Sequence, residues 1–414
     1  MYPRNAAGPL RLALALLLVA PMAVPAAPLT LDDAERLARG DDPTSQRLRE
    51  LAAARQEAAI AAGQLPDPQL IIELMDIPTD SFRPDRDEMS QLRLGLRQSF
   101  PRGASRQLAA DRERALGEAE SARADGAERS LTRAVRRAYL ELYYQRRTLA
   151  VLEQSRGLFT ELMSVTEREF AAGRASSQDL LRAELELERL EDRVLMARTA
   201  KAGALAELTR WVGAEAAGRP LTEEFPSLAP PTGALEQHPA LAAEDAGVRA
   251  GRHGVELSRQ AYRPQFSVEL SYGRSLGWNA DMEVPDRLSG MVMLDLPLFG
   301  RNRQDRDLAA SVHRRQASEL AHEERLRQLQ QQLTEAQARW QRLSEREQRF
   351  GQQLLPRAQS NAEAAEQAYR AGTADFTALM RARLMELETR LDALRISTER
   401  RLAQADLLYL LGEE

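Results

Sequence analysis

Glu-Arg-Glu-Phe-Ala-Ala-Gly at residues 167–173 and Glu-Gln-Ala-Tyr-Arg-Ala-Gly at residues 366–372 are two versions of one segment, 199 positions apart. The correspondence continues along the chain, because residues 180–185 align with residues 379–384 at the same spacing. A repeat of about 20 to 50 residues would indicate a solenoid, but this period is close to half of the 414 residues. The sequence therefore predicts one structural unit that occurs twice.

The composition is typical of long helices. Charged residues make up 29% of the chain and aromatic residues 5%, and Ala, Leu, Glu, Arg and Gln dominate. The net charge of −5 argues against binding to nucleic acid through overall charge. Lys201 is the only lysine, so nearly every basic side chain is an arginine, and a cluster of arginines does not by itself indicate a phosphate site.

The sequence contains no recognisable catalytic or metal-binding motif. It has no cysteine, which excludes disulfides, thiolate ligands, cysteine nucleophiles and a lipidated N-terminal cysteine. The four histidines lack the i, i+4 spacing of a helical metal site, and there is no phosphate-binding loop, nucleophile elbow or HExxH motif. We therefore expect a protein that is not an enzyme and that has no cofactor, no catalytic residue and no metal site.

The N-terminus has the features of a secretory signal peptide over residues 1–27. Arg4 and Arg11 supply a positive region, residues 12–20 are apolar, and the small residues within 24–27 suit cleavage. A buried N-terminal helix is the alternative. No other stretch reaches the roughly 18 apolar residues of a spanning helix, so we expect an exported protein that could cross a membrane only as a closed β-barrel.

Hydrophobic periodicity divides the first half of the chain into helices and a β-hairpin. We expect a helix over residues 31–62, followed by strands at 69–75 and 91–97, where three Leu alternate with Arg, Gly and Arg. A helical run without proline follows over residues 105–171, and a second helix returns over residues 176–213.

The second half repeats this order of elements. A helix over residues 234–259 precedes strands at 266–272 and 290–296. A long helical run then covers residues 304–371, and Pro356 predicts a kink or local break inside it. A last helix completes the second repeat.

The helix lengths suggest how each repeat is arranged. The outgoing helix is about twice as long as the returning one, and the helix before the hairpin has the length of the missing half. Each repeat should therefore be a long rod beside a split rod, with a hairpin at one end. We place the first repeat at residues 28–213, a proline-rich linker at 214–233 and the second repeat at 234–414.

The alternating strands suit a membrane barrel built from several chains, with apolar side chains toward lipid and polar ones toward a wet lumen. Four strands cannot close a barrel whose smallest bacterial form has about eight, whereas three chains would supply twelve. A soluble β-domain that caps a coiled coil is the alternative. For Met291 and Met293 we favour lipid-facing packing over contact with soft metal ions. The expected lipid-facing residues are Leu92, Leu94, Leu96, Val268, Leu270 and Tyr272, and the expected lumen-facing residues are Arg93, Arg97, Ser267, Glu269 and Ser271.

With this organisation, the mature chain resembles the TolC-like outer-membrane efflux proteins over its whole length. The resemblance rests on the duplicated plan and on the strand-to-helix junction Gln-Ser-Phe-Pro-Arg-Gly at residues 98–103, with its counterpart at 298–301. It also rests on the two tip motifs at residues 170–180 and 369–379.

The resemblance implies a mainly α fold with a small β part. Long helical hairpins would form a periplasmic tunnel, and four strands per chain would join a homotrimeric, twelve-stranded barrel in outer-membrane lipid. Such a channel is the exit duct of a tripartite efflux system and works passively with a periplasmic adaptor and an inner-membrane RND-type or ABC transporter. Residues 66–68 and 100–103 look most like the CzcC-like heavy-metal branch, so heavy-metal cations or drugs are the candidate cargo.

The resemblance also implies a gate at the periplasmic helix tips, where Gly173 and Gly372 make the turns. In the family an acid on the first tip bonds a tyrosine on the second, and the matching positions here are Asp179 and Tyr369. A simpler interpretation also fits, because Asp179 lies three residues after Ser176 and would form a helix capping box. Tyr369 could likewise only pack at the end of its helix.

Other gate positions depart from the family pattern. The basic residue expected after the second glycine is Ala374, and the acids that constrict the tunnel correspond to Ala378 and Arg381. Asp375 could instead supply a ring of three carboxylates in a trimer, although a carboxylate near a helix start is favourable without any such role.

A protein of another class remains as the rival interpretation. Periplasmic adaptors and structural coiled-coil proteins also contain helical hairpins, without a membrane barrel. They normally have one hairpin and lack both the duplication and the paired amphipathic strands that this sequence predicts.

Overall fold

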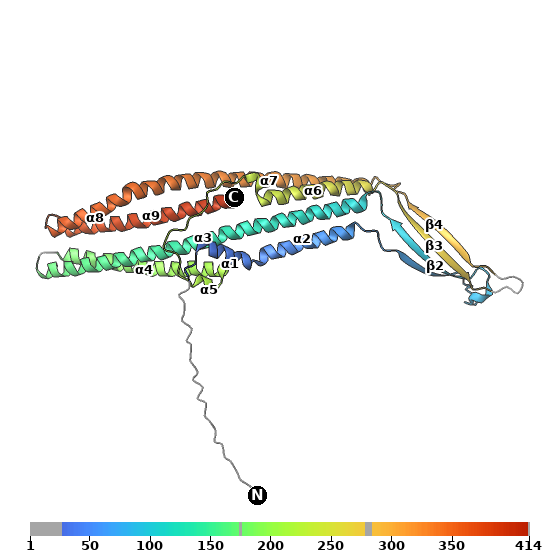
Figure 1. Cartoon of the computed structure of the whole chain (residues 1–414), viewed down its shortest axis with the longest axis horizontal. Coiled ribbons are helices and arrows are strands. Elements are labelled where there is room, and N and C mark those ends of the chain that lie inside the picture. Colours follow the sequence, from blue (N-terminus) through green and yellow to red (C-terminus); the bar gives the residue numbers. More distant parts are fainter. Residues whose placement is uncertain (1–26, 174–175, 278–283, 413–414) are drawn as a thin grey trace, which may run out of the picture.

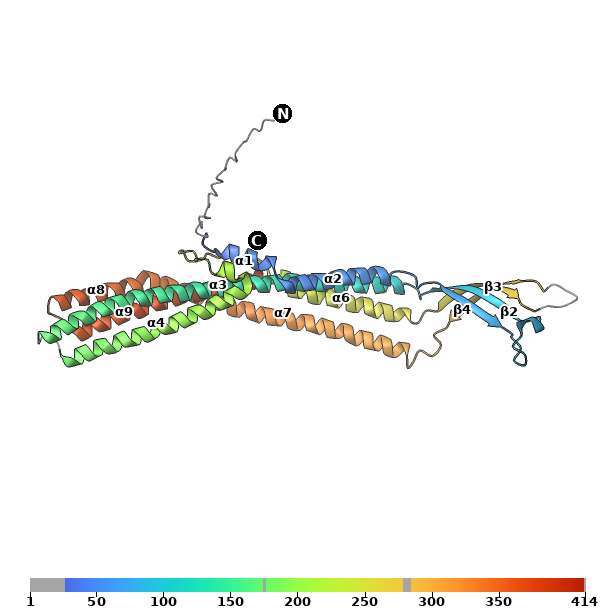
Figure 2. The ribbon, with the colours of Figure 1, turned by 90° about the horizontal axis from the view of Figure 1, so that it is seen from below.

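The computed structural model describes residues 27–173, 176–277 and 284–412 of the chain. The molecule is elongated, with the tips of two helical hairpins at one end and a β-sheet at the other (Figure 1, Figure 2). The signal peptide expected at residues 1–27 lies outside the described residues except for Ala27. Within the described part, no helix combines the length and the apolar character needed to cross a membrane.

The first repeat begins with two helices, so the single helix expected over residues 31–62 was wrong. Helix α1 spans Leu31–Gly40 and helix α2 spans Pro43–Ala62. Pro43 has no backbone N–H and its ring would clash with the carbonyl four residues earlier, so a continuous helix cannot pass through it. Asp42 caps α2 instead, because its carboxylate accepts hydrogen bonds from backbone N–H groups two and three residues later, at 3.1 and 2.9 Å.

The long helix of the first repeat is continuous. Helix α3 spans Ser105–Ala171, and its 67 residues correspond to about 100 Å. Helix α4, Ser177–Val212, packs along the tip half of α3, while α2 packs along the other half (Figure 1). The split rod predicted from the helix lengths is confirmed.

The second repeat has the same order of elements. Proline accounts for its one irregularity, because a π-helical turn, η3, replaces the regular helix at Phe350–Leu354 directly before Pro356. The wider turn accommodates the missing N–H and the ring of the proline, so the predicted local break is confirmed. The regular helices are α6 (Pro239–Gln260), α7 (Gln304–Arg349), α8 (Leu355–Arg370) and α9 (Phe376–Leu411).

The four strands form one antiparallel sheet in the order β1-β2-β3-β4. Each repeat supplies one hairpin, and the pairing of β2 with β3 joins the two repeats. The strands are β1 (Gln69–Met75), β2 (Gln91–Phe100), β3 (Gln265–Ser275) and β4 (Arg287–Asp295). Short helical turns lie in the connections, namely η1 (Pro84–Arg86), α5 (Ala214–Ala217) and η2 (Leu235–Gln237).

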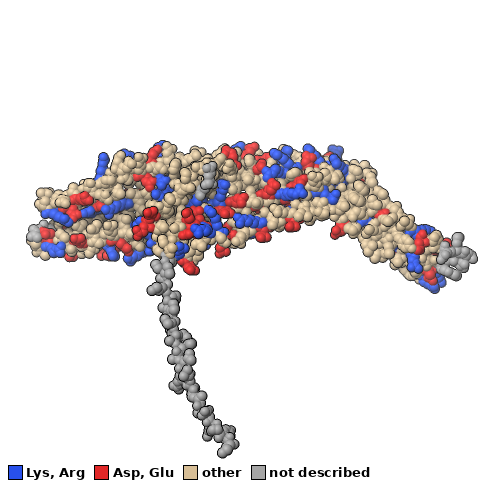
Figure 3. Space-filling view, in the orientation of Figure 1, with Lys and Arg blue, Asp and Glu red and all other residues tan. Residues whose placement is uncertain are grey.

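One face of the sheet is apolar and exposed, as the alternation predicted. Side chains from all four strands contribute to it, and Figure 3 shows this end of the molecule as less densely charged than the helices. The exposed apolar residues on this face are Leu70, Ile72, Leu74, Leu94, Leu96, Phe266, Val268, Leu270, Tyr272, Leu288, Val292 and Leu294.

The opposite face carries a cross-strand ion-pair network centred on Glu269, which is only 4% exposed. Its carboxylate accepts hydrogen bonds from Arg93 at 2.9 Å and from Arg97 at 2.7 Å. Arg93 also donates to the Ser271 hydroxyl at 2.8 Å and lies 3.5 Å from the Glu73 carboxylate. Because these residues belong to β1, β2 and β3, the network favours a single register between the two repeats.

Met291 and Met293 lie on this polar face, so the lipid-facing interpretation of the pair was wrong. In the β3–β4 pairing, Met291 is opposite Glu269 and Met293 is opposite Ser267. Directly opposite residues of an antiparallel pair project to the same side of the sheet. The β4 sequence alone could not reveal this, because residues on both of its faces are apolar.

The linker between the repeats packs against both of them. Leu221 forms a parallel β-bridge with Leu29, and the Tyr143 hydroxyl donates to a linker carbonyl at 2.9 Å. From the second repeat, Arg401 and Gln404 donate to three further linker carbonyls at 2.8 to 3.1 Å. The linker is therefore bound around the middle of the helical region.

A buried histidine starts the first helix of the second repeat. His238 is 1% exposed, and its Nδ1 accepts a hydrogen bond from the backbone N–H of Ala240 at 3.1 Å. Its ring meets the ring of Tyr409 edge-on at 5.2 Å. Burial, together with the positive charges of Arg129 and Arg325, lowers the pKa of His238 from 6.5 to about 4.

The network at Glu269 makes a prediction about stability. Glu269→Gln leaves Arg93 and Arg97 without their shared carboxylate, so we expect a loss of about 3 kcal/mol in the free energy of unfolding. The temperature at which the detergent-solubilised protein unfolds measures this loss. Glu73→Gln is the control, since Glu73 is 46% exposed and pairs at only 3.5 Å. Equal effects of the two substitutions would contradict the assignment.

His238 makes a second prediction, about pH. Its folded-state pKa is lowered, so the neutral ring stabilises the fold above pH 6.5, and this contribution is lost as the pH falls toward about 4. We expect up to about 3 kcal/mol of lost stability over that window. His238→Asn keeps a capping group without a titrating ring, so its unfolding temperature should fall less between pH 7 and pH 4. Identical pH profiles for the variant and the original protein would exclude His238 as the source.

Candidate functional site at the helix tips

The two hairpin tips have the same turn geometry. Gly173 follows α3 and Gly372 follows α8, and each has a φ of +71°. Each glycine N–H donates to the carbonyl three residues earlier, at 2.9 Å from Phe170 and 3.0 Å from Tyr369. A positive φ is costly for residues with a side chain, so the turns depend on glycine at both predicted positions. The two tips lie at the same end of the molecule (Figure 1, Figure 2).

Asp179 is bound to its own helix. The Ser176 hydroxyl accepts a hydrogen bond from the Asp179 N–H at 3.1 Å, and the Asp179 carboxylate accepts one from the Ser176 N–H at 3.2 Å. This is the reciprocal capping box that the simpler interpretation anticipated. The same carboxylate also accepts from the Ser176 hydroxyl at 2.6 Å.

Asp375 is the N-cap of α9 and is exposed. Its carboxylate accepts a hydrogen bond from the backbone N–H of Ala378 at 2.7 Å. Ala378 and Arg381 are exposed on the first turns of the same helix, and Ala374 lies directly before the cap. Asp375 therefore has a structural role in the single chain.

Tyr369 is partly buried at the end of α8, where its ring lies edge-on to Phe376 at 6.1 Å. Burial raises the pKa of Tyr369, and the nearby negative charges of Glu169 and Asp179 raise it further. Asp179 is therefore close enough to act on the phenol electrostatically. Within the described part of the single chain, no hydrogen bond links the Tyr369 and Asp179 side chains.

The two hairpins are joined near the tips by polar contacts that the sequence analysis missed. Arg182 of α4 donates to the Thr377 hydroxyl of α9 at 2.7 Å. About three helical turns further from the tip, Arg193 of α4 pairs with Glu388 of α9 at 2.5 Å. The spacing from Arg182 to Arg193 in α4 equals the spacing from Thr377 to Glu388 in α9. This equal spacing was the only sequence signal, and it does not stand out among the many Arg and Glu residues of these helices.

An apolar cluster lies beside these contacts and includes residues of both repeats. Phe159 and Leu190 of the first repeat are buried together with Phe376, Met380 and Leu387 of the second. Tyr369 packs at its edge. The tip region thus combines a shared apolar core with a few polar links between the two hairpins.

The chain was compared with known proteins. The family model for outer membrane efflux proteins matches residues 231–413. A search of curated proteins finds no match. The match covers the second repeat, and the first repeat has the same order of elements.

Solved structures with the same fold align over nearly the whole chain. A membrane protein from Pseudomonas aeruginosa has 19% identity and a TM-score of 0.77, with 92% of this chain and 90% of that chain covered. CusC has 16% identity and a TM-score of 0.78, with 94% and 93% covered. The outer membrane protein VceC from Vibrio cholerae has 16% identity and a TM-score of 0.76, with 92% and 96% covered.

These findings define a class of protein in which long helical hairpins are joined to a small sheet with one apolar face. Residues 231–413 match the outer membrane efflux protein family, and the whole chain has the fold of the solved structures named above.

Proposed function

We propose that this protein is the outer-membrane exit duct of a tripartite efflux system. It conducts cargo passively from the periplasm to the exterior, while an inner-membrane transporter of the RND or ABC type supplies the energy and a periplasmic adaptor connects the two. The observation that carries this proposal is the combination, in one chain, of the efflux-family match with a sheet whose apolar face is exposed over all four strands. The rival interpretation, a periplasmic adaptor without a barrel, gives no reason for that face.

The sheet is suited to assembly with two further copies. In the described sheet, β1 and β4 each pair on one side only. An unpaired strand edge is a template for another strand, and three copies joined edge to edge supply twelve strands. The exposed apolar face then contacts outer-membrane lipid, and the Glu269 network faces the lumen. We propose a homotrimer built in this way.

We also propose a division of the chain and a branch of the family. Residues 1–27 are the signal peptide, residues 28–213 and 234–414 are the two structural repeats, and residues 214–233 link them. The junction at 100–103 supports the heavy-metal branch, so that heavy-metal cations are proposed as cargo ahead of drugs. In the structure this junction packs on the end of α6, where the backbone N–H of Ala104 donates to the side-chain oxygen of Gln260 at 3.2 Å.

We place the gate at the helix tips. The channel is closed while the α3–α4 and α8–α9 hairpins remain linked, and it opens when a partner separates them. Asp179 and Tyr369 lie at this position, with Asp375 at the start of α9. Arg182 and Arg193 supply polar links between the hairpins that are worth little individually because both are partly solvated. Weak links of this kind can be broken by a docking partner.

Localisation and assembly test the function directly. After fractionation of cells that express the full chain, we expect it in the outer membrane as a trimer that dissociates only on heating. Recovery as a soluble periplasmic monomer would reject the channel and support the rival interpretation.

The gate makes a separate prediction about conductance in planar bilayers. Tyr369→Phe, Asp179→Ala and Arg182→Ala should each raise the conductance several-fold, because Arg182 links the two hairpins and the proposed gate places Asp179 and Tyr369 at the same position. Arg189→Ala is the matched control, since among the described residues Arg189 pairs within its own helix, with Glu186 at 2.9 Å.

Capping must be separated from gating in that experiment. Ser176→Ala removes the capping hydroxyl, at a cost of about 1 kcal/mol, but keeps the carboxylate of Asp179. If Ser176→Ala raises the conductance as much as Asp179→Ala does, the effect belongs to the cap. Unchanged conductance in the Tyr369, Asp179 and Arg182 variants would remove the gate from this position.

A further inference from the structure

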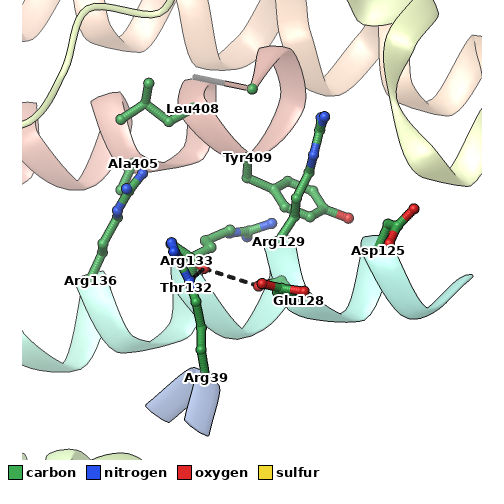
Figure 4. Close-up of a pocket in the computed structure, with 11 residues that line it drawn as sticks. Arg39, Asp125, Glu128, Arg129, Thr132, Arg133, Arg136, Ala405, Leu408 and Tyr409 are labelled. Carbon is green, nitrogen blue, oxygen red and sulfur yellow. Dashed lines mark hydrogen bonds between the residues drawn. The ribbon is translucent and has the colours of Figure 1, made fainter. Parts of the chain in front are cut away.

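A cavity of about 310 Å³ lies in the middle of the molecule, between α1, α3 and the end of α9 (Figure 4). This volume is at the small end of the range for ligand sites, about 300 to 1,000 Å³. The walls include the ring of Tyr409 and the hydroxyl of Thr132. Four arginines also line the cavity, namely Arg39, Arg129, Arg133 and Arg136.

The charges of three of these arginines are compensated by neighbouring carboxylates. Glu35 binds Arg136 at 2.6 Å and Arg39 at 3.2 Å. Asp406 binds Arg133 at 2.9 Å. These ion pairs hold the guanidinium groups around the cavity.

Arg129 differs from the other three. In the part of the chain that the structure describes, it has no ion pair within 4 Å, and its Nη1 is buried without a hydrogen-bond partner. The guanidinium lies near Gly412, beyond the last turn of α9. A buried cationic donor without an acceptor is unfavourable, and an acceptor that carries negative charge would stabilise this group most strongly.

A second unpaired donor lies close by. His238 accepts a hydrogen bond at Nδ1, so its neutral ring carries the proton on Nε2, and Nε2 is buried without a partner among the described residues. His238 and Arg133 both contact the ring of Tyr409, at 5.2 and 4.9 Å from its centroid. The region around Tyr409 therefore has an excess of donors.

The two acidic residues of the cavity wall, Asp125 and Glu128, do not pair with these unpaired donors. Glu128 pairs with Arg49, which is outside the cavity, at 2.8 Å. Asp125 is exposed, and its carboxylate is not within ion-pair distance of Arg129. Arginine is so common in this chain that clustering alone indicates nothing, but a buried Nη1 without a partner among the described residues distinguishes Arg129 from the other three arginines of the cavity.

We propose that this cavity is a binding site for a small phosphate-type oxyanion, which Arg129 holds with its planar pair of donors beside Arg133 and Tyr409. Arginine binds phosphate oxygens through two parallel hydrogen bonds, and a doubly charged oxyanion compensates charge as a water molecule cannot. The bound anion links α3 to the end of α9, and so joins the two repeats at the middle of the molecule. This site is independent of the gate at the helix tips.

Calorimetric titration of the detergent-solubilised full-length trimer tests the proposal, with inorganic phosphate and glycerol phosphate as separate titrants. We expect saturable binding of at least one of them, and the tighter one identifies whether the free ion or an ester is preferred. Arg129→Gln should weaken that binding about tenfold or more, which is the loss of one strong charge-assisted contact. Arg112→Gln, an exposed arginine of the same helix, is the matched control and should bind normally.

Three results would overturn the proposal. The first is no saturable binding of either titrant, and the second is an equal effect of Arg129→Gln and Arg112→Gln. The third concerns Glu413 and Glu414, which follow Gly412 and lie outside the described residues. Binding that appears only after both are replaced by Gln would assign Arg129 to the chain's own carboxylates. A thermal-shift measurement confirms that each variant is folded, and none of these readouts depends on conductance.

Discussion

Helix α3 is the element on which the placement of the other helices depends. It packs against α1, α2, α4, α6 and α9, and it runs without interruption from the sheet to one of the tips. Where α2 lies against it, small residues permit a close approach, and a Cβ at Gly117 would lie 3.3 Å from the Cβ of Arg55. Further along, the larger side chains of Val135 and Tyr139 are fully buried in a cluster with Leu29 and with Leu221 of the linker. The change from small to large residues along α3 sets how closely its neighbours pack against it.

Polar contacts between the repeats occur at several levels of the molecule. At the sheet, Glu269 bridges two strands that belong to different repeats. In the middle, the linker is bound from both sides, and Arg133 reaches Asp406 of α9. Near the tips, Arg182 and Arg193 reach across to α9. The exposed polar contacts at the tips are weaker than the buried one at the sheet, so the polar links at the tips are the easier ones to break.

Much of the fold could be predicted from periodicity and from the chemistry of proline and glycine. The bounds of α3, the turns at Gly173 and Gly372, and the disturbance before Pro356 all follow from local rules. The break at Pro43 was missed although the same rule applies to it, because the hydrophobic pattern continues across the break. The face occupied by Met291 and Met293 could not be predicted, since it depends on which residues of β3 lie opposite them.

The candidate site shows the limit of such reasoning. The family resemblance indicated Asp179 and Tyr369, and the structure places them near each other, with Asp179 engaged in its helix cap. The contact of Arg182 with Thr377 had only the equal spacing of the two pairs as a signal in the sequence, and the Nη1 of Arg129, which has no partner among the described residues, had none. Both depend on which helices become neighbours across nearly half of the chain.

By itself, the sequence determined the duplicated order of elements, the lengths of the helices and the alternation of the strands, because backbone propensity and hydrophobic period act over a few neighbouring residues. Only the tertiary structure decided the register between β2 and β3, the face on which the methionines lie and the partners of individual arginines. Those features depend on distances between residues that are far apart in the chain. Among so many similar arginines, packing decides which are paired with a carboxylate and which, like Arg129, keep a buried donor without an acceptor among the described residues.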